Sequence, residues 1–358
     1  MRAANSRLLV LVLLADLTLV RAGQTQDPAP AAIRPQGLTI EVLDGMTHLP
    51  GGLAALPEPP IPPGNPQAAT TIELGRKLFF DTRLSKDGST SCATCHDPEK
   101  AYSDDRATAA GLNQTVLSRR TPSLLNSAYD HVLFWDGRVR SLEEQALVPM
   151  LGKDEMGMPN PRTLLIRVQE VPEYRQRFRA AFARPVNLQD IQRAIAAFER
   201  TLITPHSAFD RYAGGDKQAL TDRQKRGLIL FIGKASCSQC HNGPNFTDNK
   251  FHALGALPGE DQNRDMGHFA VTRNPADRFA FKTPSLRSAT QQSHFMHNGS
   301  FSSLPQVIAF YNDGGGQGPK SNLLFPLHLT DAEQHDLLSF LDALAGRVPG
   351  DIRGAGQK

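Results

Sequence analysis

The sequence has little net charge and no compositional extreme. Its 358 residues include 39 basic and 36 acidic side chains, which leaves a formal net charge of +3. The small positive excess is scattered along the chain, which argues against a nucleic-acid partner. With 40% hydrophobic and 21% charged residues, the composition excludes a disordered or collagen-like chain. The length suits about two domains with ample core.

The sequence also lacks a hydrophobic run long enough to span a bilayer. Its longest apolar run, residues 8–20, follows two arginines and contains Asp16. Such a stretch is typical of a secretory signal, so we predict a signal peptide at residues 1–22. The alternative is a buried N-terminal helix. We therefore expect an exported, periplasmic protein without a transmembrane span.

Cysteine is scarce, and its four copies follow one pattern. They occur in Cys92-Ala-Thr-Cys95-His96 and in Cys237-Ser-Gln-Cys240-His241. Four cysteines in an exported chain would ordinarily suggest two disulfides. The CxxCH spacing instead predicts covalent c-type haem, in which two thiols form thioethers and the adjacent imidazole ligates iron. We predict two covalently bound c-type haems. A zinc site or two redox disulfides are the alternatives, although zinc ligands cluster and the motifs lie 145 residues apart.

An internal repeat surrounds the two motifs. Before them, GRKLF from Gly75 matches GLILF from Gly227. After them, TPSLLNSAYDHVLFWDG from Thr121 matches TPSLRSATQQSHFMHNG from Thr283 without a gap. Self-similarity of this kind indicates duplicated structural units. We predict two tandem cytochrome c-like haem domains related by internal duplication.

Long runs of alternating β-branched residues are missing as well, whereas apolar residues recur at helical spacing. Several segments open with Ser, Thr or Asp caps. The predicted helices span residues 71–80, 141–150, 162–169, 188–201, 222–231, 304–311 and 331–343. The predicted fold class is therefore mainly α. The expected parts are an extended proline-rich arm at 23–66, an N-terminal haem domain at 67–213 and a C-terminal haem domain at 214–358.

The repeat also predicts which haem is open. The position 28 residues after Thr121 is Pro149, and the same count from Thr283 gives Tyr311. A tyrosine oxygen can ligate haem iron, whereas proline offers no donor atom. We expect Tyr311 to close haem 2 and Pro149 to leave haem 1 open to peroxide. The alternative for Tyr311 is a buried aromatic whose hydroxyl has a backbone partner.

Other side chains could compete as ligands of the second haem. They are Met266, His294, Met296 and His297. Residues 97–130, which follow the first motif, contain no His and no Met. This difference supports an open first haem.

In these motifs the chain resembles the bacterial di-haem cytochrome c peroxidase and MauG family over nearly all of its predicted mature length. The resemblance rests on ELGRKLFFDTRLS, both CxxCH sites, FWDGR, EEQALVPM, DEMGM, GPNFTD, FKTPSLR, MHNGSF and FYNDGG. It implies that the N-terminal haem meets hydrogen peroxide and that the C-terminal haem relays electrons across Trp135, the only Trp in the chain. A core anchor is the other role for this indole. The resemblance also implies that the family's distal acid-base residues correspond to Gln145 and Glu155, with Pro149 beside them. Such residues are needed because splitting the O–O bond requires a proton transfer.

Within the family the sequence is similar to the MauG-like branch. The other branch has a Met at the position of Tyr311, and a His that caps the peroxide haem near residues 111–112. The family's calcium between the haems is doubtful here. Arg120 replaces its usual Asn, and Gln292 and His294 replace the Thr and Pro that complete the site. We expect no calcium in that place, with Arg120 supplying the positive charge.

Two functions of different class stay open. One is a periplasmic peroxidase or oxidase that draws electrons from a small donor protein, a c-type cytochrome or a cupredoxin, or from a residue of a protein substrate. The other is a di-haem electron-transfer cytochrome without peroxide chemistry. A ferric spectrum distinguishes them, since an open haem adds a high-spin signal and two closed haems are wholly low-spin.

Overall fold

The computed structural model describes residues 37–260 and 264–348. The predicted signal peptide at 1–22 and the arm as far as residue 36 lie outside the described residues. Helices predominate, as the sequence predicts. Within the described ranges, no helix has the length and apolar character needed to cross a membrane.

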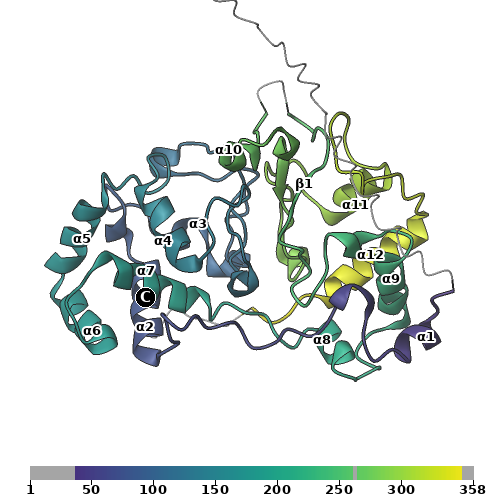
Figure 1. Ribbon diagram of the computed structural model, residues 1–358, viewed down its shortest axis with the longest axis horizontal. Helices are drawn as coiled ribbons and strands as arrows, with labels where there is room; N and C mark the ends of the chain where they lie inside the picture. The colour runs from purple at the N-terminus through teal and green to yellow at the C-terminus, as the bar shows by residue number, and fades with distance from the viewer. Residues whose placement is uncertain (1–36, 261–263, 349–358) are drawn as a thin grey trace, which may run out of the picture. The chain divides into compact units, whose positions relative to one another are not determined.

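The helices of the described chain are joined by long irregular segments (Figure 1). They are α1 (Ile40–Asp44), α2 (Ala69–Phe79), α3 (Cys92–Cys95), α4 (Leu142–Leu151), α5 (Pro161–Glu170), α6 (Pro172–Phe182), α7 (Leu188–Glu199), α8 (Ala208–Ala213), α9 (Asp222–Ile232), α10 (Phe269–Thr272), α11 (Leu304–Asn312) and α12 (Asp331–Ala343). Two short antiparallel strands, β1 (Phe251–Ala253) and β2 (Ala280–Lys282), pair Phe251 with Lys282. Short 3-10 turns, such as Cys237–Gln239, occur between the helices.

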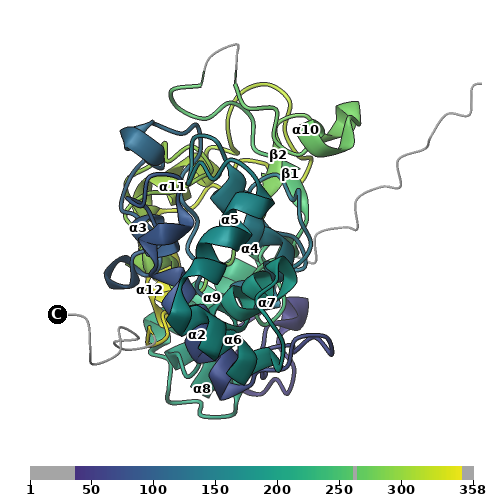
Figure 2. The same cartoon turned by 90° about the vertical axis from the view of Figure 1, so that its left-hand side faces the viewer.

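Each half is built around one closely packed pair of helices. Helix α2 lies against α7, and α9 lies against α12 (Figures 1 and 2). A glycine allows both close approaches: a Cβ on Gly75 would overlap the carbonyl oxygen of Ala194, and a Cβ on Gly227 would overlap that of Asp336. The repeated GxxLF sequence therefore has the same packing role in both halves.

The aromatic rings of the two helix pairs repeat the same geometry. The centroids of Phe79 and Phe198 are 5.1 Å apart with an interplanar angle of 58°. Phe231 and Phe340 have the same separation and angle. This match confirms the internal duplication, and it extends the repeat into α7 and α12.

The loops after the haem motifs repeat their backbone conformation as well. Asn126 and Ser288 have positive φ values of 64° and 59°, and Phe134 and Met296 have values of 65° and 67°. The two residues of each pair lie 162 positions apart. Non-glycine residues adopt this conformation rarely, so the shared values indicate one loop fold used twice.

The prediction of a wholly extended arm is wrong at α1. Thr39 caps this short helix by accepting a hydrogen bond from the Val42 amide. Leu43 is fully buried in the C-terminal core. Asp44 accepts hydrogen bonds from Tyr212 at 2.9 Å and from Lys225 at 2.7 Å. These tertiary contacts stabilise five helical residues that would not form a helix alone.

We expect Gly227→Ala to destabilise the C-terminal half. Alanine has the better helix propensity, by about 1 kcal/mol, but its methyl group would overlap the Asp336 carbonyl. Overpacking costs about 3 kcal/mol. This cost exceeds the gain in helix propensity, so the free energy of unfolding should decrease. Urea unfolding of the haem-loaded protein measures the change in the free energy of unfolding. Gly64→Ala is the matched control because a Cβ there meets nothing within 4 Å. Equal stability of the two variants would contradict the packing role of Gly227.

Candidate functional site

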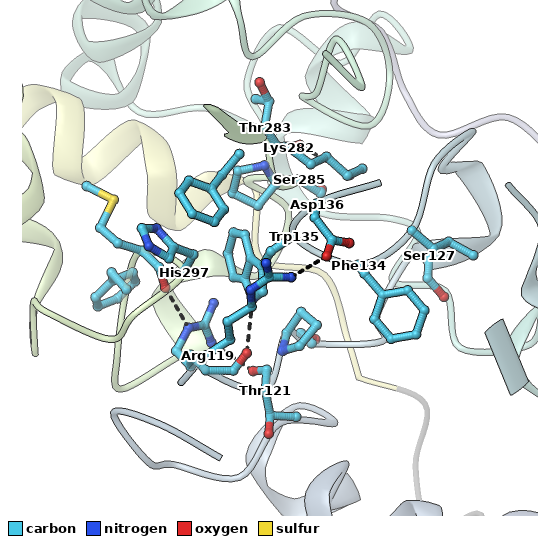
Figure 3. A pocket seen from close by; sticks show the side chains of 18 of the residues that line it. Arg119, Thr121, Ser127, Phe134, Trp135, Asp136, Lys282, Thr283, Ser285 and His297 are labelled. Atoms are coloured by element: carbon cyan, nitrogen blue, oxygen red, sulfur yellow. Dashed lines mark hydrogen bonds and ion pairs between the residues drawn. The ribbon is translucent and has the colours of Figure 1, made fainter. Parts of the chain in front are cut away.

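One cavity of about 1150 Å³ is lined by residues of both halves. Figure 3 shows part of its wall, with Trp135 among Arg119, Asp136 and His297. Every site residue predicted from the sequence lies on this wall: Cys92, Cys95, His96, Trp135, Gln145, Pro149, Glu155, Cys237, Cys240, His241 and Tyr311. The fold thus brings together residues that are up to 219 positions apart.

The two motif histidines are held alike. The Nδ1 atom of His96 lies 3.1 Å from the Tyr102 carbonyl oxygen, and that of His241 lies 3.0 Å from the Phe246 carbonyl oxygen. A proton on Nδ1 donated to this carbonyl leaves the Nε2 lone pair free to ligate a metal. Burial lowers the pKa of His96, and it lowers that of His241 to about 4, so both rings are neutral as ligation requires.

The four cysteines lie on the cavity wall and form no disulfide. Burial raises the pKa of Cys95 to about 11 and that of Cys237 to about 12. A structural zinc site gathers four protein ligands. The one group of three or more metal-ligand side chains in the described ranges is Cys240, Asp248 and His252. The donor set therefore fits two covalently attached haems better than zinc.

Trp135 lies where the two halves meet. Its side chain is 7% exposed, and its indole Nε1 donates to the Arg120 carbonyl oxygen at 2.9 Å. The Lys282 amide donates to the Trp135 carbonyl at 2.9 Å, and the Arg120 amide donates to the His297 carbonyl at 2.7 Å. The two donors, Arg120 and Lys282, lie 162 residues apart, and so do the two acceptors, Trp135 and His297. The contact is therefore reciprocal, as in a two-fold interface.

The predicted acid-base residues share the wall on the N-terminal side. Gln145 and Pro149 are one turn apart on α4, and Glu155 follows in the next loop. Gly152 lies close to the Glu155 carboxylate, so a side chain there would have to displace it. Burial raises the pKa of Glu155, and the positive charge of Arg138 partly offsets this effect. A raised pKa makes the carboxylate a stronger proton acceptor, as a general acid-base group requires.

The segment at residues 111–112, where the other branch has a capping histidine, packs against the Glu155 loop. The Leu112 amide donates to the Asp154 carbonyl oxygen at 3.0 Å. A Cβ on Gly111 would overlap that same oxygen. The loop therefore has no room for a side chain at position 111.

Tyr311 occupies on α11 the position that Pro149 has on α4. Its ring packs edge-on against Phe310 at 5.4 Å. Burial raises its pKa. No hydrogen-bond partner of its hydroxyl is found among the described residues. The geometry leaves this oxygen available to the cavity.

The competing ligands differ in their position relative to the cavity. Met266 and His294 are absent from the cavity wall, whereas Met296 and His297 line it. The His297 ring stacks on Phe281 at 3.5 Å, and its Nε2 lies 3.3 Å from a Glu260 oxygen. These contacts hold His297 at the junction beside Trp135.

Sequence reasoning missed Glu199, the last residue of α7. It lines the cavity, is 3% exposed, and has one carboxylate oxygen without a hydrogen-bond partner in the described chain. Burial raises its pKa to about 8. Because Phe198 corresponds to Phe340, Glu199 corresponds to Leu341. An alignment of the repeat extended through these helices would have revealed the substitution.

The chain is similar to known di-haem proteins over most of its length. The family model described as di-haem cytochrome c peroxidase matches residues 69–218. Cytochrome-c peroxidase IdrP1 of Pseudomonas sp. (strain SCT) is 42% identical over 330 residues, covering 83% of this chain and 86% of that protein. Methylamine utilization protein MauG of Methylorubrum extorquens is 42% identical over 288 residues, covering 80% and 81%.

Solved structures give the same likeness. A MauG-like protein associated with microbial copper homeostasis superposes with a TM-score of 0.75 at 33% identity, covering 82% of this chain and 94% of that one. The diheme peroxidase BthA from Burkholderia thailandensis E264 has a TM-score of 0.66 at 25% identity, with coverages of 79% and 89%.

The raised pKa of Glu199 predicts a pH dependence of stability. The folded chain binds this proton up to about pH 8, whereas an unfolded Glu, with a pKa of 4.5, loses it at much lower pH. The folded state therefore holds more protons in this window, and the free energy of unfolding should fall as the pH rises through it. Glu199→Gln should flatten the fall, as measured by urea unfolding of the haem-loaded protein at several pH values. Glu58→Gln, at an exposed carboxyl, is the control. An unchanged slope in Glu199→Gln would contradict the prediction.

Proposed function

The chain belongs to the di-haem cytochrome c peroxidase and MauG family, and we propose that it reduces hydrogen peroxide at an open N-terminal haem in the periplasm. In this proposal Trp135 and the C-terminal haem deliver the electrons. Family membership makes the protein a haem-dependent, peroxide-reducing oxidoreductase. The observation that carries the finer proposal is the single cavity that joins both CxxCH motifs to Trp135, Gln145 and Glu155.

Each haem would be held by one motif. Cys92 and Cys95 would form thioethers to the first haem and His96 would ligate its iron. Cys237, Cys240 and His241 would hold the second in the same way. Bound haem supplies the redox chemistry, because its iron can give electrons to peroxide and recover them from a donor. The backbone carbonyls of Tyr102 and Phe246 orient the two imidazoles.

In this proposal Glu155 transfers a proton, and Gln145 orients the peroxide. Reduction of one hydrogen peroxide to two waters consumes two electrons and two protons. The Glu155 carboxylate accepts the proton of one peroxide oxygen, and the resulting carboxyl donates it to the other, which leaves as water. The Gln145 side-chain amide can donate a hydrogen bond that orients the peroxide. The raised pKa of Glu155 suits both steps.

The two halves divide the work through one pair of equivalent positions. Pro149 provides no donor atom, so the N-terminal side of the cavity keeps room for peroxide. Tyr311 provides an oxygen that would close the second haem and favour its more oxidised state. Trp135 lies at the reciprocal contact between the halves, where an easily oxidised indole can relay electrons.

The electron source would be a small c-type cytochrome or cupredoxin, or an oxidisable residue of a protein substrate. Relatives are named cytochrome-c peroxidases, which supports the first. The relative named MauG, together with Tyr311, supports the second. The apolar run at residues 8–20 supports export.

Glu155→Gln should keep both haems attached and slow peroxide cleavage by a factor of about 10² or more, because the amide cannot exchange the proton. Stopped-flow mixing with hydrogen peroxide measures the rate, and pyridine haemochrome spectra measure haem content. Glu58→Gln changes an exposed carboxyl that is not on the cavity wall and should react at the parent rate. Equal rates for the two variants would remove Glu155 from the mechanism.

Tyr311→Phe should remove the oxygen ligand of the second haem while keeping the ring in place. We expect the low-spin ferric signal of this haem to be lost in electron paramagnetic resonance, with both haems still attached. Tyr129→Phe, which removes a hydroxyl bonded to the Pro57 carbonyl at 2.7 Å, is the control. An unaltered low-spin signal in Tyr311→Phe would assign the ligand to another residue, such as Met296 or His294.

A further inference from the structure

Two buried cations, Lys282 and Arg120, each contact an oxygen-bearing side chain of the other half. The Lys282 ammonium lies 3.1 Å from a carboxylate oxygen of Asp130. The equivalent pair, 162 positions away in each case, is Arg120 with Gln292, whose side-chain oxygen lies 3.4 Å from the guanidinium. An acid thus neutralises one buried cation, while a neutral amide faces the other.

Arg120 therefore keeps its positive charge inside the protein. The residue is 8% exposed. In the part of the chain that the structure describes, it has no carboxylate in ion-pair contact, and only the more distant Asp104 attracts its charge. Burying an unpaired charge is costly, so a cation kept in such a place is expected to have a role.

Neutral oxygens from both halves surround this guanidinium. Its Nε lies 3.3 Å from the Met296 carbonyl oxygen, and its Nη1 lies 3.2 Å from that of Thr121 and 3.4 Å from the Gln292 side-chain oxygen. Carbonyl and amide oxygens are also the ligands that calcium prefers. The guanidinium occupies the space among these oxygens that an ion would need, so the residues do not fit a bound calcium.

Arg120 also holds Trp135 in two ways. Its carbonyl oxygen accepts the indole hydrogen bond at 2.9 Å, and its guanidinium lies 5.6 Å from the centre of the indole ring. One residue therefore ties the indole of the N-terminal half to the 292–296 loop of the C-terminal half.

We propose that the Arg120 guanidinium is a built-in cation that takes the place of a metal ion at this junction and positions Trp135. Its positioning of an electron relay rests on the proposed function, whereas its role as the junction cation does not. A covalently attached cation cannot be lost by dilution or removed by a chelator. The oxygens around it should accept calcium only when the guanidinium is removed.

The test compares the thermal unfolding midpoint of haem-loaded protein in EGTA and in calcium chloride. The parent should contain no calcium by elemental analysis and should have the same midpoint in both. Arg120→Asn should lower the midpoint in EGTA by about 5 °C, and calcium should restore at least half of the loss. Arg120→Lys, which keeps the charge, should stay close to the parent and insensitive to calcium. Arg278→Asn, at an exposed arginine, controls for the loss of charge alone.

A parent that contains calcium, or that EGTA destabilises, would overturn the proposal even if Arg120→Asn does not fold. An Arg120→Asn protein that is destabilised but indifferent to calcium would overturn it too, since packing alone would then explain the loss.

The electron relay through Trp135 is measured separately, as oxidation of the second haem after peroxide is added. It should be lost in Arg120→Asn with EGTA, as in Trp135→Phe, and return with calcium. A calcium response in midpoint without any peroxide reaction in the parent would reject the proposed function and keep the junction cation.

Discussion

The reciprocal backbone hydrogen bonds between the halves fix the geometry on which the cavity depends. Each half donates a backbone N–H, from Arg120 or Lys282, to the carbonyl of the ring-bearing residue opposite, His297 or Trp135. Contacts of the form i to j and j to i belong to two-fold interfaces, and duplication supplies them here within one chain. Because main-chain atoms make these bonds, the four side chains could diverge while the two halves stayed in register.

Divergence at equivalent positions then gives the two halves different chemistry. Three such pairs have at least one member on the cavity wall: Pro149 with Tyr311, Glu199 with Leu341, and Asp130 with Gln292. In the first pair a donor atom is present only in the C-terminal half. In the second a buried acid is present only in the N-terminal half. In the third one junction cation is neutralised and the other keeps its charge. A symmetric scaffold thus holds an asymmetric set of ionisable groups.

Most features that could be predicted from the sequence, such as the haem motifs and the helices, depend on residues close together in the chain. The CxxCH spacing is local, and so are the caps that begin helices, such as the Thr221 and Gln224 capping box of α9. Helix α1 was missed because its stability comes from burying Leu43 against residues more than 150 positions away. Glu199 was missed because the helical period does not show which side of α7 faces a cavity. The contacts of Arg120 could not be predicted, since they form only when the halves meet.

Arg120 and Glu199 answer the same physical problem in opposite ways. Burial penalises the charged form of each. Glu199 can lose its charge by keeping a proton, and its pKa near 8 means that it is mostly neutral at pH 7. Burial lowers the pKa of Arg120 only to about 10, so the guanidinium stays charged and must be solvated by protein oxygens instead. Of the two, only Arg120 is charged at pH 7, and its field acts on the Trp135 indole 5.6 Å away.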